Sequence, residues 1–165
     1  MIDKKSTLWS YLSKGQKGLI ETGEFLLKDA KEHNKPLSDF SYIVFPFAKS
    51  YEGFLKQLFL DMEFITKLDY ESNRFRIGRA LNPHYAKERP DNSVYLKIGK
   101  YCGGDYLANK LWNAWKRGRN LLFHYFPQNL QKIDLNEAGS TINLIISAME
   151  KSFISCAPTK KHDRV

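Results

Sequence analysis

Residues 44–65, which read VFPFAKSYEGFLKQLFLDMEFI, carry the strongest secondary-structure signal of the chain. Apolar side chains recur there at steps of three and four residues, the periodicity of a helix with a buried face. The members of this stripe are Val44, Phe47, Ala48, Tyr51, Leu55, Leu58, Met62 and Ile65. The pattern predicts a core helix over about 38–66. Because proline lacks the amide donor, Pro46 should kink this helix or lie near its true start.

Three other segments are expected to be helical. The first covers about 6–33, begins at the candidate cap Ser6 and carries apolar residues at helical spacing. Gly15, Gly18 and Gly23 interrupt it, and each glycine costs a helix interior about 1 kcal/mol relative to alanine. We expect these glycines to allow close packing between helices.

The second half of the chain contains the other two helices. One is predicted over about 105–125 by an apolar stripe, and Pro127 ends it. The other begins at Asp134, where Glu137 three residues later completes a capping box, and its apolar face continues to Phe153.

The stretch 67–103 has no comparable periodicity. Apolar and polar residues alternate over 75–77 and 94–98, which permits two short strands or a hairpin, and proline and glycine mark turns nearby. We interpret the stretch as loops with little regular structure. The sequence therefore predicts an all-α fold, an antiparallel bundle of four main helices with an irregular insertion at about 67–103. It forms one domain of residues 1–157, followed by a basic tail of residues 158–165.

The composition limits the class of protein and of partner. The 165 residues suffice for one domain, and a hydrophobic fraction of 42% excludes a disordered chain. No apolar run approaches the roughly 18–20 residues of a membrane-spanning helix. With 26 Lys and Arg against 18 Asp and Glu, the net charge is +8. This excess suits a polyanion such as RNA, and an acidic protein partner would suit it equally.

The cysteines and the N-terminal residues indicate a cytoplasmic chain. Cys102 and Cys156 cannot supply a disulfide framework or a four-thiolate zinc site, so a reducing setting is the simplest interpretation. The first residues form no continuous apolar segment, and we expect no secretory signal. The histidines and cysteines show no ligand spacing, so we expect neither a metal nor another cofactor.

The peptide WNAWKRGRNLLFHY, which begins at Trp112, holds the candidate functional site. Lys116, Arg117 and Arg119 place three cations beside two tryptophans, and the first two are candidates to bind RNA phosphates. A solvated face at a helix end would explain the same charges. Trp112, Trp115 and Arg119 share one helix face, and we expect the tryptophans to form a subunit interface or core rather than a platform for bases.

The same peptide carries groups suited to cutting a phosphodiester. Arg119 can stabilise charge on phosphoryl oxygens, His124 can transfer a proton at neutral pH, and Asn120 can orient either group. RNA supplies its own nucleophile, the 2′-hydroxyl, so no metal is required. His124 could instead cap the helix end, and Tyr51 and Glu52 could support the site or be an ordinary core aromatic and surface acid.

The alignment of these groups is incomplete on a straight helix. Arg119 and His124 are five residues apart, about 140° around a helix with 3.6 residues per turn. Either fraying of the helix end or a second copy of the chain must bring them together. Arg79 and His84 have the same spacing, but we interpret them as a chance match, because a polar residue does not follow Arg79 and a proline intervenes.

The segment from Arg119 to His124 resembles the motif of HEPN-domain ribonucleases, in which an arginine and a polar residue precede a histidine. Residues 45–56 and the helix after Asp134 resemble the HEPN region of ribonuclease LS-type toxins. The resemblance implies a helical bundle that dimerises with its motifs face to face. It also implies a metal-independent endoribonuclease, the toxin of a toxin–antitoxin or phage-defence system, with a cognate antitoxin protein as partner.

Two alternatives to this enzyme remain open. One is a non-catalytic HEPN module that binds RNA or a protein partner, and the other is a purely structural helical domain. For the enzyme, the sequence predicts a homodimer with the helices over 105–125 near the two-fold axis, because one chain offers a single Arg119 and a single His124.

Overall fold

The computed structural model describes residues 1–33 and 36–156, and within these ranges every regular element is a helix. The all-α prediction is therefore confirmed. Residue 157, the expected end of the domain, and the predicted basic tail over 158–165 lie outside the described residues. None of the helices in the described part of the chain combines the length and the apolar character needed to cross a lipid bilayer.

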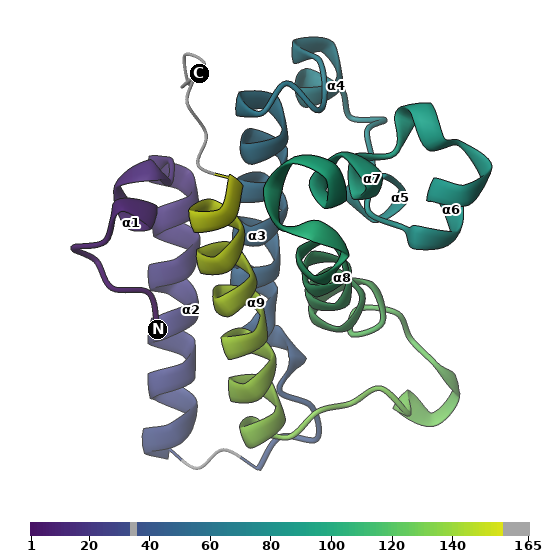
Figure 1. The fold of residues 1–165 in the computed structure, drawn as a ribbon. Coiled ribbons are helices and arrows are strands. Elements are labelled where there is room, and N and C mark those ends of the chain that lie inside the picture. Colours follow the sequence, from purple (N-terminus) through teal and green to yellow (C-terminus); the bar gives the residue numbers. More distant parts are fainter. Residues whose placement is uncertain (34–35, 157–165) are drawn as a thin grey trace.

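Three long helices, α2 (Lys14–His33), α3 (Ser41–Asp61) and α9 (Leu135–Cys156), lie side by side (Figure 1). α3 packs against both of the others. α2 runs antiparallel to α3 and α9, whereas α3 and α9 run in the same direction. The fourth main helix, α8 (Gly104–Trp115), packs against α9 and crosses the long helices steeply, so that Figure 1 shows it almost along its axis.

α3 is the centre of the core. Of the apolar stripe that predicts it, Phe47, Tyr51 and Leu58 are completely or almost completely buried. Residues outside that stripe, such as Phe54 and Phe59, are also buried, because α3 is enclosed on several sides rather than along one face. Pro46 lies inside α3, in its second turn, so the helix begins a few residues before the proline.

The predicted helix over 6–33 is two helices, α1 (Thr7–Tyr11) and α2. Ser6 caps the first helix by accepting a hydrogen bond from the backbone N–H of Trp9, as expected. The predicted helix is interrupted between α1 and α2 because Ser13 and Gln16 form a second N-terminal cap. The backbone N–H of Ser13 donates to Gln16 Oε1 at 2.8 Å, and that of Gln16 donates to Ser13 Oγ at 3.2 Å.

Only one of the three glycines in this region allows close helix packing. A Cβ on Gly23 would lie 2.3 Å from Phe47 Cε2, so α2 and α3 meet where a side chain is missing. A Cβ on Gly15 or Gly18 would have no atom within 4 Å, and these two residues have no such role.

The insertion over 67–103 is helical, which corrects the expected loops or hairpin. Its elements are α4 (Lys67–Glu71), α5 (Ile77–Ala80), α6 (Pro83–Glu88), η1 (Pro90–Asn92), α7 (Val94–Ile98) and the π-helical turn η2 (Gly99–Gly103). In α7, Val94 and Ile98 are four residues apart and share the buried face, whereas Leu96 is 42% exposed. An alternating pattern of three apolar residues therefore fits one helical turn as well as a strand, and the cap that Ser93 provides selects the helix.

The helix predicted over 105–125 ends early. α8 stops at Trp115 and is followed by a π-helical turn, η3 (Lys116–Asn120), after which residues 121–126 form turns and extended chain. A short 3₁₀ turn, η4 (Pro127–Asn129), leads towards α9. The predicted capping box is confirmed, because the backbone N–H groups of Asp134 and Glu137 each donate to the other's carboxylate at 2.8 Å.

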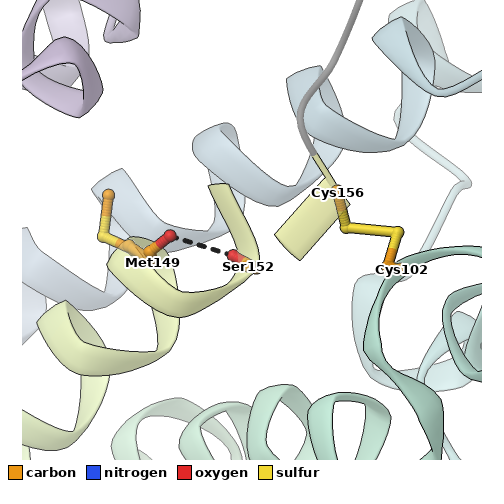
Figure 2. The surroundings of a disulfide bond; sticks show 4 residues. All are labelled: Cys102, Met149, Ser152 and Cys156. Atoms are coloured by element: carbon orange, nitrogen blue, oxygen red, sulfur yellow. Dashed lines mark hydrogen bonds between the residues drawn. A yellow bond between two sulfur atoms is a disulfide. The ribbon is translucent and has the colours of Figure 1, made fainter. Parts of the chain in front are cut away.

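A disulfide joins Cys102 in η2 to Cys156 at the end of α9, with 4.4 Å between the Cα atoms (Figure 2). The sequence alone favours reduced cysteines, so this bond is a further difference from the expectation. It links the last turn of the insertion to the C-terminal end of a core helix. The path from the insertion into α8 is thus fixed covalently at the top of the bundle.

Candidate functional site

The wide turn η3 presents the cations of the motif. Gly118 in the middle of this turn is buried, and a Cβ there would lie 2.8 Å from Ile145 Cδ1 of α9. The turn therefore rests on α9 through its glycine, while Lys116, Arg117 and Arg119 are exposed. The close packing of the Ile145 side chain against the turn accounts for glycine at this position.

Arg119 is held between two elements. Its Nε lies 3.7 Å from Glu52 Oε2 of α3, and its guanidinium carbon lies 5.5 Å from the ring centroid of Trp115. The two charged side chains are 44% and 35% exposed, so solvent screens the pair and its contribution to the free energy of unfolding is below about 1 kcal/mol. The main effect of these contacts is to restrict the orientation of the Arg119 guanidinium, because it is held by an ion pair and an aromatic face together.

Tyr51 and Glu52 have separate roles. Tyr51 is completely buried and its hydroxyl donates to the backbone oxygen of Leu111 at 3.1 Å, and burial raises its pKa well above the ordinary 10.0. It is a core residue that ties α3 to α8. Glu52 is the member of the pair that reaches the site.

Arg119 lines a cavity of about 420 Å³ between α8 and the insertion. The polar groups around it are three guanidinium groups, two side-chain amides and one carboxylate: Arg76, Arg79, Arg119, Asn82, Asn120 and Glu52. The cavity thus has two more positive than negative side chains and many N–H donors. These are the properties of a site for an anion with several oxygen acceptors, such as a phosphodiester.

Arg79, which the sequence analysis interprets as part of a chance match, also lines the candidate site. It lies in α5, lines the same cavity as Arg119, and its guanidinium carbon is 4.4 Å from the ring centroid of Tyr85. His84, its supposed motif partner, is exposed on α6 and is not among the residues that line this cavity. The spacing of Arg79 and His84 does not reveal that Arg79 lines the cavity while His84 does not. Two arginines three residues apart, Arg76 at the N-cap of α5 and Arg79 within it, are the signal that could have indicated a basic site.

The predicted catalytic residues are only partly brought together. Arg119 and Asn120 line one cavity, whereas His124 does not line it. His124 is exposed in the turn after η3, and its backbone N–H donates to the backbone oxygen of Leu121 at 3.4 Å. The chain after η3 therefore leaves His124 outside the cavity that Arg119 and Asn120 line in the same chain.

Trp112 and Trp115 differ in exposure. Trp115 is 6% exposed and packs on Gly78 of the insertion, where a Cβ would lie 2.5 Å from the indole Nε1. Trp112 is half-buried and lines the cavity. Of the two residues predicted for a subunit interface, Trp115 makes its contacts within its own chain, and Trp112 is the one that retains accessible surface.

Exposed aromatic surface lies on the other side of the ion pair. A hollow of about 160 Å³ is lined by Glu52 and Arg119 together with Phe45 and Phe123. The rings of Phe45 and Phe123 meet edge to face at 5.5 Å, and Phe45 is 53% exposed. Arg117 points elsewhere and lines a separate hollow of about 410 Å³ against α9.

In the ranges 1–33 and 36–156, no three or more His, Cys, Asp or Glu side chains lie close enough together to hold a metal ion. Comparison of the chain with protein-family models, with curated proteins and with solved structures finds no match. The geometry around Arg119 and the resemblance of its sequence motif are therefore the grounds for a proposal about function.

Proposed function

We propose that this chain is a metal-independent endoribonuclease that acts in the cytoplasm and leaves 2′,3′-cyclic phosphate and 5′-hydroxyl ends. The observation that carries the proposal is the position of Arg119. It is oriented by Glu52 and Trp115 at the edge of a cavity that also contains Asn120 and two further arginines. A directed guanidinium in an electropositive cavity is what a transition state with charge on phosphoryl oxygens requires.

The reaction needs one proton acceptor, one proton donor and charge stabilisation. The 2′-oxygen of RNA attacks the adjacent phosphorus as its proton leaves, and the bond from phosphorus to the 5′-oxygen breaks as that oxygen gains a proton. Arg119 stabilises the charge on the non-bridging oxygens. His124 supplies or removes a proton, and Asn120 orients the phosphate through its amide.

The cavity is completed by a second copy of the chain. Because His124 is exposed outside the cavity that Arg119 and Asn120 line, a two-fold axis near η3 would place the partner's His124 beside Arg119. Trp112 and the exposed ring of Phe45 give apolar surface for such a contact.

The first test is cleavage of a single-stranded RNA by His124→Ala, with His84→Ala as the matched control. Both histidines are exposed, but only His124 belongs to the motif. We expect His124→Ala to lose cleavage while His84→Ala retains it, with unchanged circular dichroism and with activity that survives EDTA. Equal cleavage by the two variants, or a strict magnesium requirement, would contradict the proposal.

The shared site is tested by mixing inactive variants. His124→Ala and Arg119→Ala subunits should each be inactive alone, and their mixture should recover part of the activity, since one composite site in the heterodimer is intact. A cleavage-competent monomer at every concentration, shown by light scattering together with the assay, would exclude this arrangement.

The resemblance to ribonuclease LS-type toxins gives the cellular role. We expect expression of the chain to arrest growth, His124→Ala to abolish the arrest, and a co-expressed antitoxin encoded next to it to suppress the arrest. An acidic antitoxin would suit the net charge of +8.

A non-catalytic HEPN module that binds RNA or a protein partner is the second candidate, and the position of His124 outside the cavity favours it. The two functions separate in one experiment. A binding module retains RNA without producing cyclic phosphate ends at any protein concentration, whereas the enzyme produces them in proportion to time.

A further inference from the structure

The cavity beside Arg119 shares a wall with a larger cavity on the insertion. Arg76, Arg79 and Tyr85 line the 420 Å³ cavity and also a second cavity of about 710 Å³, so they form a wall common to both. The larger cavity adds two further cations, Arg74 and Lys97, and two carboxylates, Glu63 and Asp69, so four positive and two negative side chains line it. Positive side chains thus extend from η3 across the insertion.

We infer that the 67–103 insertion is an RNA-binding element, in which Arg76 and Arg79 hold phosphates of the single strand that flanks the bond beside Arg119. The inference rests on the proposed function for the identity of the polyanion. It extends the proposed site beyond the motif from Arg119 to His124, because Arg76 and Arg79 belong to the insertion.

The two arginines of the wall are available for an anion. Within the described part of the chain, no ion pair joins Arg76 or Arg79 to a carboxylate. The guanidinium of Arg79 lies over the Tyr85 ring, and that of Arg76 donates one hydrogen bond to the backbone oxygen of Asn73. A guanidinium carries five N–H donors, so both residues retain donors for an anion. Both residues are exposed.

The remaining charges of the larger cavity are partly committed. The carboxylate of Asp69 accepts hydrogen bonds from the backbone N–H and hydroxyl of Thr66 at 3.0 and 2.7 Å. The ammonium of Lys97 donates to the backbone oxygen of Phe64 at 2.9 Å. The side chains that can respond to a ligand are therefore mainly arginines, and phosphates are their preferred partners.

Aromatic rings beside these arginines favour unpaired nucleotides over a duplex. Phe75 lines the larger cavity, Tyr85 lines both, and Trp112 lines the smaller one, and all three are half-buried with one part accessible. Rings placed between cations are typical of proteins that bind single strands, where bases stack while the backbone follows the charge. A paired helix has no unstacked bases to offer such rings.

The test measures binding separately from cleavage. Full-length His124→Ala protein is titrated against a short fluorescein-labelled single-stranded RNA by fluorescence anisotropy over a series of KCl concentrations. Arg76→Gln and Arg79→Gln are added singly and together. Lys87→Gln is the matched control, because Lys87 is an exposed cation of the same insertion that lines neither cavity.

We expect the double variant to bind at least tenfold more weakly at low salt. Its slope of log K against log salt should be smaller by about 1.4, since each phosphate contact to a single strand contributes about 0.7. Lys87→Gln should change affinity less than about twofold, and all variants should keep the thermal unfolding curve of the parent.

Four outcomes would overturn the inference: equal losses in the control, unchanged binding by the double variant, tighter binding of a duplex of the same sequence, or displacement of the RNA by equimolar inorganic phosphate. Failure of the nuclease would look different. In that case the unmodified chain does not cleave RNA, yet the double variant still loses binding, and the insertion remains an RNA-binding element.

Discussion

Replacing Gly23 by alanine tests the packing of α2 on α3. The added Cβ would lie 2.3, 2.7 and 2.9 Å from three ring atoms of Phe47, whereas carbon atoms in ordinary contact are about 3.5–4.0 Å apart. Phe47 is 1% exposed, so its ring cannot swing into solvent. Either the ring or the whole helix must move by about 1 Å or more.

The magnitude follows from two opposing terms. Overpacking a filled core costs about 1–3 kcal/mol, and alanine gains about 1 kcal/mol over glycine in a helix interior. Gly18→Ala in the same helix carries the second term without the first, because nothing lies within 4 Å of its added Cβ. The difference between the two variants isolates the packing term, and we expect Gly23→Ala to be less stable than Gly18→Ala by about 1–3 kcal/mol.

The assay is urea denaturation followed by circular dichroism, with both variants and the parent chain measured in one buffer. Gly18→Ala should be slightly more stable than the parent, which checks the propensity term. If Gly23→Ala proves as stable as Gly18→Ala, the close contact between α2 and α3 does not exist in solution and the arrangement of the long helices is wrong.

Three further predictions concern single side chains. Burial opposes ionisation of Asp39, but hydrogen bonds from Asn129, Ser41 and Ile133 lower its pKa below the ordinary 3.8. The ionised carboxylate therefore stabilises the fold above pH 3.8, and this stabilisation is lost as the pH falls through the lowered pKa. Asp39→Asn should make the free energy of unfolding depend less on pH between about pH 5 and 2. Glu52→Gln should reduce RNA cleavage while changing the free energy of unfolding by less than about 1 kcal/mol, and Glu150→Gln, which alters an exposed carboxylate on α9, should leave cleavage unchanged. Tyr11→Phe removes a buried donor that lies 2.6 Å from the Asp61 carboxylate, and should destabilise the chain by about 1.5–3 kcal/mol in the same urea assay.

The long helices could be predicted from sequence because their signals are repeated. The stripe from Val44 to Leu58 contains several turns of consistent spacing, and the Asp134–Glu137 box marks a helix start unambiguously. The break before α2 could also have been predicted, since Ser13 and Gln16 have the spacing of a capping box. The apolar periodicity over 6–33 continues across the break, so periodicity alone predicts one helix where the two caps define two.

The insertion and the site were harder for a physical reason. Elements of four to six residues contain about one turn, so the periods of two and 3.6 residues cannot be distinguished over 75–77 or 94–98. The cavity depends on tertiary contacts that bring Arg79 of α5 to Arg119 of η3, forty residues later in the chain. Spacing along one helix cannot reveal such a pair, and it also gave no sign that α8 would widen into a π turn before His124.

The disulfide between Cys102 and Cys156 joins residues 54 positions apart and closes the chain between them into a covalent ring. Arg119, Asn120 and His124 all lie inside that ring, together with α8 and α9. A single protease cut in the exposed turns between them would open the ring without releasing a fragment, so the nicked chain should migrate as one band on a non-reducing gel and as two after reduction. Oxidised protein could therefore lose the backbone continuity of its candidate site while every one of its residues stayed attached to the same molecule.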